Sequence, residues 1–110
     1  MGKFVISKRK NGEFQFNLLA GNGQVILASE GYASKPSCVN GVKSVKKNAA
    51  DPRRFDAKVA QNGKFYFNLK ASNGQVIGKS EMYEAQASCD NGIASVAKNA
   101  SGATIDDQTK

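Results

Sequence analysis

The chain contains one stretch of sequence twice, and this repeat decides the fold. Residues 11–49 read NGEFQFNLLAGNGQVILASEGYASKPSCVNGVKSVKKNA, and residues 62–100 read NGKFYFNLKASNGQVIGKSEMYEAQASCDNGIASVAKNA. The copies are offset by 51 residues without a gap, and 24 of the 39 aligned positions are identical. The whole chain has 110 residues, and each copy is near the lower size limit for a core of its own. We therefore expect a single domain, residues 1–110, in which two repeats share one core.

Each repeat begins with a strand pattern. Around the first copy, apolar and polar residues alternate over residues 4–7 and 14–18, and residues 24–30 have an apolar centre. The pairs Asn11-Gly12 and Asn22-Gly23 separate these segments and are typical of two-residue hairpin turns. Because such turns join antiparallel neighbours, the pattern predicts a three-strand meander in each repeat.

A helix follows the third strand. Ser34 can cap its start, and Pro36 is tolerated in the first turn. At about 100° of rotation per residue, one face collects small and apolar residues. These are Cys38, Gly41, Val42, Val45 and Ala49, matched by Cys89, Gly92, Ile93, Val96 and Ala100. The stripe predicts that each helix packs on its meander, with both cysteines as small buried core residues.

The predicted fold class is α+β. Two tandem βββαβ repeats, about 3–52 and about 53–105, form one antiparallel sheet with two helices packed on it and pseudo-twofold symmetry. The strand over residues 53–60 ends the first repeat and opens the second, and residues 103–105 supply a short closing strand. Residues 106–110 are predicted to be a flexible tail. Because the duplication mimics a fused homodimer, we expect a monomer.

Several segments resemble the YegP-like family of uncharacterised bacterial proteins. The resemblance rests on residues 22–32, Ser34-Lys35 and residues 40–49, and both copies match over nearly the whole chain. The second copy departs from it at Gly78-Lys79 and Met82. The resemblance implies tandem βββαβ units in a single sheet, with the terminal strands exchanged between units. It implies no activity, substrate or catalytic residue.

The composition argues against catalysis and against a membrane. The chain has no histidine, so neither cysteine has an imidazole partner, and two thiols alone do not make a zinc site. We predict no enzyme, cofactor or metal. Without a signal peptide or a long apolar run, we expect a cytoplasmic protein without a membrane partner.

Four residues at matched repeat positions are candidates for a groove between the repeats. They are Glu30, Tyr32, Glu81 and Tyr83. A carboxylate pair across the pseudo-twofold axis is the one arrangement that would suit acid–base chemistry. The alternative is structural: each glutamate caps a helix or pairs with lysine, and each tyrosine lies in the seam between helix and sheet.

The charge is concentrated in the first repeat. The chain carries a net +7, of which residues 1–51 contribute +5, with eight basic and three acidic side chains. The candidate polyanion-binding residues are Lys8, Arg9, Lys10, Lys43, Lys46, Lys47, Arg53 and Arg54. The second helix has Ala94 and Ala97 in place of Lys43 and Lys46, so the basic helix face belongs to one repeat only. A merely solvated helix face is the alternative.

These observations favour a small basic, non-enzymatic binding or accessory module. The leading hypothesis is a polyanion such as nucleic acid as the partner, since basic surfaces attract phosphate backbones. The second is a protein partner that docks on an exposed sheet face or edge. A small enzyme is the more remote alternative.

Overall fold

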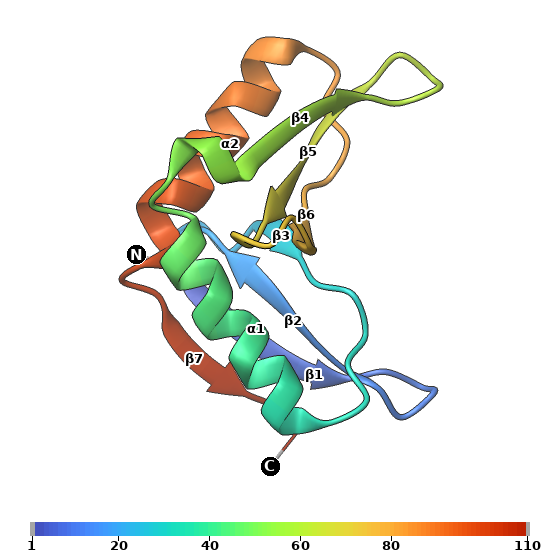
Figure 1. The fold of residues 1–110 in the computed structure, drawn as a ribbon, viewed down its shortest axis with the longest axis vertical. Coiled ribbons are helices and arrows are strands. Elements are labelled where there is room, and N and C mark those ends of the chain that lie inside the picture. Colours follow the sequence, from blue (N-terminus) through green and yellow to red (C-terminus); the bar gives the residue numbers. More distant parts are fainter. Residues whose placement is uncertain (1, 110) are drawn as a thin grey trace.

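The computed structural model describes residues 2–109, and Figure 1 shows them as one curved sheet with two helices packed against it. In these residues the sheet has seven strands in the order β4-β5-β6-β3-β2-β1-β7. The elements are β1 (Lys3–Lys8), β2 (Phe14–Leu19), β3 (Val25–Ala28), α1 (Lys35–Asn48), the short 3₁₀ helix η1 (Pro52–Arg54), β4 (Phe55–Val59), β5 (Phe65–Lys70), β6 (Val76–Lys79), α2 (Gln86–Ala100) and β7 (Thr104–Asp107). The predicted α+β architecture of tandem βββαβ units is confirmed.

The hairpin turns are longer than the two-residue turns predicted from the Asn-Gly pairs. In the first turn, the Gly12 N–H donates to the Arg9 carbonyl (3.0 Å) and the Arg9 N–H donates to the Glu13 carbonyl (2.7 Å). Gly12 has a φ of 87°, whereas no residue other than glycine among those described has a positive φ. The Asn11 side chain instead accepts the Glu13 N–H (3.0 Å). The glycine therefore takes the left-handed position and the asparagine closes the turn with its side chain.

Each helix packs closely on the sheet at a glycine. A Cβ atom on Gly41 would lie against the Tyr32 hydroxyl and 2.9 Å from Cε2 of Phe16. The Phe16 and Tyr32 rings stack with centroids 6.2 Å apart, so the helix backbone rests on an aromatic pair. Gly92 repeats the arrangement against Tyr83. Close approach to the sheet therefore explains why a glycine stands in the middle of each helix.

The two repeats share one core because each helix contacts strands of both. α1 contacts β2 of its own repeat together with β5 and β6 of the other, and α2 contacts β5 together with β3 of the first repeat. Phe16, Leu27, Phe67 and Leu69 are fully buried within one cluster. Cys38 and Cys89 are buried free thiols, as predicted.

The closing strand joins the repeats. β7 follows α2 but pairs with β1 of the first repeat, so the predicted exchange of terminal strands is confirmed. The pairing is parallel, with Phe4 opposite Ile105, and the sheet is therefore mixed rather than wholly antiparallel. The chain leaves α2 at the start of β1, where the Thr104 N–H donates to the Gly2 carbonyl (3.3 Å), and from there it runs in the same direction as β1.

The closing strand is also longer than predicted. β7 extends to Asp107, and the Gln108 N–H donates to the Ile6 carbonyl (2.9 Å). The prediction of a flexible tail over residues 106–110 is therefore wrong for residues 106–108, and Lys110 lies outside the described residues. Asp106 pairs with Lys3 (3.9 Å) and Asp107 pairs with Lys35, and these ion pairs hold the end of β7 against the sheet and the first helix. A search for alternating apolar residues does not find a strand that ends in two aspartates.

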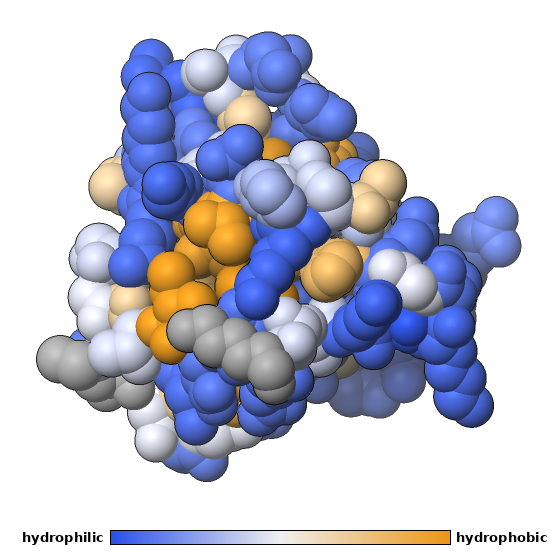
Figure 2. Space-filling view, turned by 90° about the horizontal axis from the view of Figure 1, so that it is seen from below, coloured by the Kyte–Doolittle hydropathy of each residue, from blue (hydrophilic) through white to orange (hydrophobic). Residues whose placement is uncertain are grey.

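Figure 2 views the end of the molecule that β7 closes. Most of this face is hydrophilic, with one hydrophobic area within it. Ile105 of β7 remains 47% exposed, so the strand covers β1 without being buried itself.

The close packing at Gly41 predicts a cost for any side chain there. Gly41→Ala should lower the free energy of unfolding by about 1–2 kcal/mol, because overpacking outweighs the gain in helix propensity. Urea denaturation measures the change. In a Tyr32→Phe background, which lacks the hydroxyl, the same substitution should cost less.

Gly102→Ala is the matched control for this prediction. A Cβ atom on Gly102 meets nothing within 4 Å, so its substitution should change stability by less than about 0.5 kcal/mol. Equal costs at Gly41 and Gly102 would contradict the proposed role of the aromatic pair.

The ion pair of β7 predicts a pH dependence of stability. The Lys35 ammonium, helped by Thr109, lowers the pKa of Asp107 to about 2. Because this folded-state pKa lies below the unfolded value of about 3.9, the contribution is fully present above that pH and is lost as pH falls through about 2. Urea midpoints between pH 5 and pH 2 should therefore converge for the wild type and Asp107→Asn as the pH falls.

Lys35→Gln, which installs the residue found at the equivalent position of α2, should lose the same pH dependence. Adding Asp107→Asn to it should then have little further effect. A wild-type advantage that persists undiminished to pH 2 would show that the ion pair does not hold β7.

Candidate anion-binding groove along the first helix

The first helix brings two of the predicted basic residues, Lys43 and Lys47, to one hollow. The hollow has a volume of about 420 Å³ and lies between α1 and the turn that joins β5 to β6. Its lining is Asn40, Lys43, Ser44, Lys47, Asn48, Ala71, Ser72 and Asn73. Seven of these eight residues have polar side chains, and none of the described residues in the lining is acidic. We call this hollow the α1 groove.

The two lysines lie near each other on one side of α1, at the same hollow. Both are exposed, and they lie one helical turn apart, about 6 Å along the axis. No ion pair within residues 2–109 involves either of them. The Asn48 amide donates to the Ser44 carbonyl (2.8 Å), which fixes part of the polar wall. Ammonium and amide groups of this kind hold phosphate oxygens.

The groove continues toward the start of α1 as a second hollow of about 330 Å³. The two hollows share Asn40 and Ser44 in their linings. The second one contains Glu30 and Tyr32, two of the predicted groove residues, but neither Glu81 nor Tyr83. The flank of α1 therefore has a basic end with two lysines and another end with one acidic residue.

The structure places the other predicted basic residues elsewhere. Lys46 extends over the Phe4 ring, with Nζ 6.0 Å from the ring centroid, and does not line the groove. Arg53 and Arg54 both pair with Asp51, at 3.0 and 3.7 Å. The hydrogen bond from Arg53 is the largest cause of a lowered pKa at Asp51. The charge of these guanidinium groups is thus partly offset locally.

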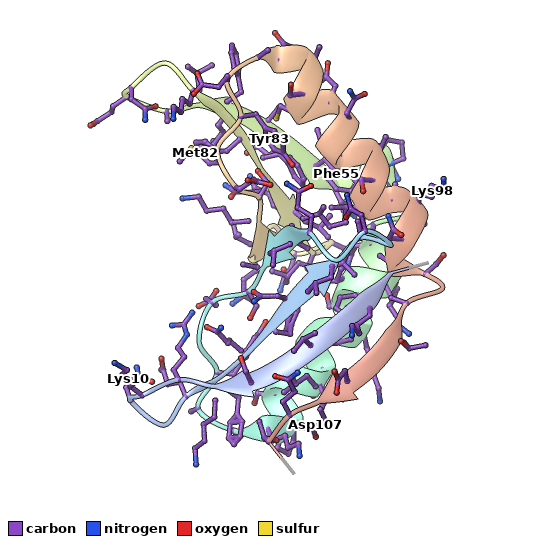
Figure 3. The ribbon with its side chains drawn as sticks, turned by 180° about the vertical axis from the view of Figure 1, so that it is seen from behind. Lys10, Phe55, Met82, Tyr83, Lys98 and Asp107 are labelled. Carbon is purple, nitrogen blue, oxygen red and sulfur yellow. The ribbon has the colours of Figure 1, made fainter. Side chains whose placement is uncertain are left out.

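Lys8, Arg9 and Lys10 belong to the hairpin between β1 and β2. Figures 1 and 3 place this hairpin, with Lys10 at its tip, away from the C-terminal half of α1. Arg9 pairs with Glu13 (3.8 Å), and Lys8 lies over the Phe14 ring at 5.5 Å. These three residues therefore form a separate basic segment.

The two tyrosines are packed in equivalent seams between helix and sheet. Burial is the largest cause of the raised pKa of both Tyr32 and Tyr83. Figure 3 shows Tyr83 between the sheet and α2. This position supports the structural alternative for the tyrosines, although Tyr32 also borders the hollow beside Glu30.

The dipeptide Ser-Glu occurs in both repeats, as Ser29-Glu30 and Ser80-Glu81, and its serine has a structural role. The Ser29 hydroxyl accepts the Phe16 N–H (2.9 Å) and donates to the Glu30 carbonyl (2.8 Å). Ser80 makes the equivalent bonds in the second repeat. The buried serine ends each third strand, while both glutamate side chains are exposed.

The wall formed by residues 71–73 was not predicted from the sequence. These residues look like an ordinary hairpin turn, and their place beside α1 depends on how the two repeats pack. The one signal in the sequence for this site was that the first helix has lysines where the second helix has alanines.

The fold and the groove describe a duplicated α+β protein built from two βββαβ units. Residues 10–56 and 60–107 each match a family described as "Domain of unknown function (DUF1508)". The chain belongs to the UPF0339 family of proteins with tandem repeats of this kind, whose function is unknown. This confirms the predicted YegP-like resemblance.

The similar proteins match over nearly their whole length. The UPF0339 protein in the ptx operon 5′ region of Stutzerimonas stutzeri is 54% identical over 104 residues, 94% of either chain. UPF0339 protein YegP of Escherichia coli K12 is 49% identical over 108 residues, 98% of either chain.

Two solution NMR structures have the same fold. That of yegP from E. coli, described as a protein of unknown function, matches with a TM-score of 0.93 at 48% identity, over 97% of this chain and 92% of that one. That of a UPF0339 protein from Shewanella oneidensis matches with a TM-score of 0.91 at 49% identity, over 96% and 90%. Neither helix in the described residues is long and apolar enough to cross a bilayer.

Proposed function

We propose that this protein is a non-enzymatic module that binds a polyanion in the α1 groove. The observation that carries the proposal is the pair Lys43 and Lys47, which line one hollow without a carboxylate beside them. The net charge of +7 adds a long-range attraction for the same class of ligand.

A nucleic-acid backbone is the polyanion that suits this groove best. It offers successive phosphates to two ammonium groups, and the amide side chains of Asn40 and Asn73 add donors along the same hollow. No aromatic side chain of the described residues lines the α1 groove, and Tyr32 in the neighbouring hollow is stacked on Phe16. The proposed contact is therefore with phosphate rather than with bases, and little sequence preference is expected.

The proposal predicts a specific loss of salt-sensitive binding. Fluorescence anisotropy with labelled single-stranded RNA and DNA, titrated over a series of salt concentrations, measures the affinity. Removing both contacts in Lys43→Ala/Lys47→Ala should reduce the slope of log K against log salt by about 1.4, at roughly 0.7 per phosphate contact. Binding at low salt should weaken with it.

Lys98→Ala is the matched control. Lys98 occupies on α2 the position that Lys47 occupies on α1, but the neighbouring lysine is replaced there by Ala94. Figure 3 shows Lys98 on the outer side of α2. If Lys98→Ala weakens binding as much as the change at Lys47 alone, the protein attracts polyanions by net charge only. Absence of salt-sensitive binding by the wild type would overturn the proposal.

A protein partner is the second candidate, and a different observation favours it. Among residues 2–109, no strand pairs with the outer edge of β4, whereas the equivalent edge of β1 is covered by β7. The α1 groove and this edge are distinct surfaces, so the two functions can be tested independently.

A further inference from the structure

The two repeats differ most where their first strands end the sheet. β4 is the counterpart of β1, but among residues 2–109 no strand lies on its outer side (Figure 1). Phe4 and Ile6 of β1 are at most 1% exposed. Their counterparts Phe55 and Ala57 are half-buried and exposed. The sheet edge that β7 covers in the first repeat is therefore uncovered in the described part of the second repeat.

The open edge offers unpaired backbone groups. The Ala60 N–H donates to the Lys64 carbonyl (2.8 Å), which shows that Ala60 points toward β5. Because the backbone groups of successive residues in a strand point alternately to its two edges, Ala57 and Val59 present their N–H and carbonyl groups to the outside. At the equivalent place in β1, the Ile6 carbonyl receives the Gln108 N–H (2.9 Å). The outer edge of β4 therefore presents the same backbone groups with which β1 binds the parallel strand β7.

A small hollow lies directly beside this edge. It has a volume of about 90 Å³ and is lined by Ala57, Lys58, Val59, Phe65, Gln86 and Cys89. This volume is about that of three waters at roughly 30 Å³ each, enough for a medium aliphatic side chain. In the first repeat, Ile6 replaces Ala57, and Lys35 replaces Gln86. The hollow arises because the second repeat has the smaller and the uncharged residue.

The substitutions at the edge indicate which side chains an added strand would carry. Asp106 of β7 pairs with Lys3 (3.9 Å), and the counterpart of Lys3 is the cationic Arg54. Arg54 already pairs with Asp51 (3.7 Å). Asp106 lies opposite Val5, whose counterpart is the acidic Asp56, so this position does not select a carboxylate. Asp107 pairs with Lys35, whose counterpart Gln86 has no charge. Lys58, which also lines the hollow, already pairs with Asp56 (3.3 Å). An aliphatic residue therefore suits this second position, because a carboxylate there would have no free cation to meet.

We propose that the outer edge of β4 binds an extended segment of a partner protein. The segment runs parallel to β4, with an apolar residue opposite Phe55 and a medium aliphatic residue opposite Ala57. Backbone hydrogen bonds supply affinity and the hollow supplies specificity, as in other cases of strand addition. In a second copy of this chain, β7 is already paired with its own β1, so a different protein is the occupant.

Two synthetic peptides test the proposal. One has the sequence of residues 103–109, and the other has the same sequence with Asp107→Leu. Titrated into ¹⁵N-labelled protein, the Asp107→Leu peptide should bind about tenfold more tightly than the unchanged one, since it fills the hollow with an aliphatic group. Its chemical-shift changes should be confined to β4 and the first turn of α2.

Two variants of the protein sharpen the test. Ala57→Pro removes an outward N–H at a sheet edge that tolerates proline, and binding of the Asp107→Leu peptide should be lost while the spectrum stays folded. Ala57→Ile/Gln86→Lys rebuilds the first-repeat set of side chains. It should reverse the preference, so that the peptide with the unchanged Asp107 binds more tightly.

Three results would overturn the proposal. The first is binding of neither peptide by the wild type, and the second is shift changes centred on β1, which would mean that peptides only compete with β7. The third is a concentration dependence of the β4 signals without peptide, which would make the edge an interface between copies. These outcomes do not depend on whether the α1 groove binds a polyanion.

Discussion

The packing of each helix across strands of both repeats is the interaction on which the rest of the structure depends. α1 lies on β2 but also on β5 and β6, and α2 lies on β5 but also on β3. Neither repeat can therefore bury its apolar face without the other. Gly41 and Gly92 bring each helix close to its own half of the sheet, because the helix backbone rests there on a tyrosine and a phenylalanine ring. Each strand that follows a helix then pairs in the opposite half, which ties the repeats together.

The departures from symmetry are where binding surfaces arise. Exchange of the closing strand covers the edge of β1 and, in the part of the chain that the structure describes, leaves the outer edge of β4 unpaired. Packing of α1 beside the turn of the second repeat creates a groove that two lysines line, and the second helix has an alanine at one of the equivalent positions. The residues shared by the copies, such as the buried Ser29 and Ser80, mainly maintain the fold. A duplicated protein can in this way keep one scaffold and place different surfaces on its halves.

Much of this fold could be predicted from the sequence, because its local signals agree. Alternating strands, a capped helix with Cys38, Val42 and Val45 on one face, and the 51-residue offset all indicate the same architecture. The parallel direction and length of β7 could not be predicted in this way. They depend on where α2 ends relative to β1 and on the pairing of Asp107 with Lys35. Neither can be predicted from the spacing of apolar residues.

The candidate site was only partly predictable for a similar reason. The basic charge of the first helix was visible, but the helical period alone did not show that Lys46 turns toward Phe4 or that Asp51 pairs with both arginines. The groove's second wall and the open edge of β4 come from contacts between residues far apart in the chain. Such surfaces follow from tertiary packing, so a linear motif does not reveal them.

Native-state hydrogen exchange, followed residue by residue in low concentrations of urea, tests the central claim most directly. If the repeats form one cooperative unit closed by β7, the amides of Phe16, Phe67 and Ile6 should exchange only through global unfolding, with the same free energy. The amide of Ala57, the counterpart of Ile6 on the open edge, should exchange without unfolding. Different opening free energies at Phe16 and Phe67, or protection of Ala57 equal to that of Ile6, would contradict the account.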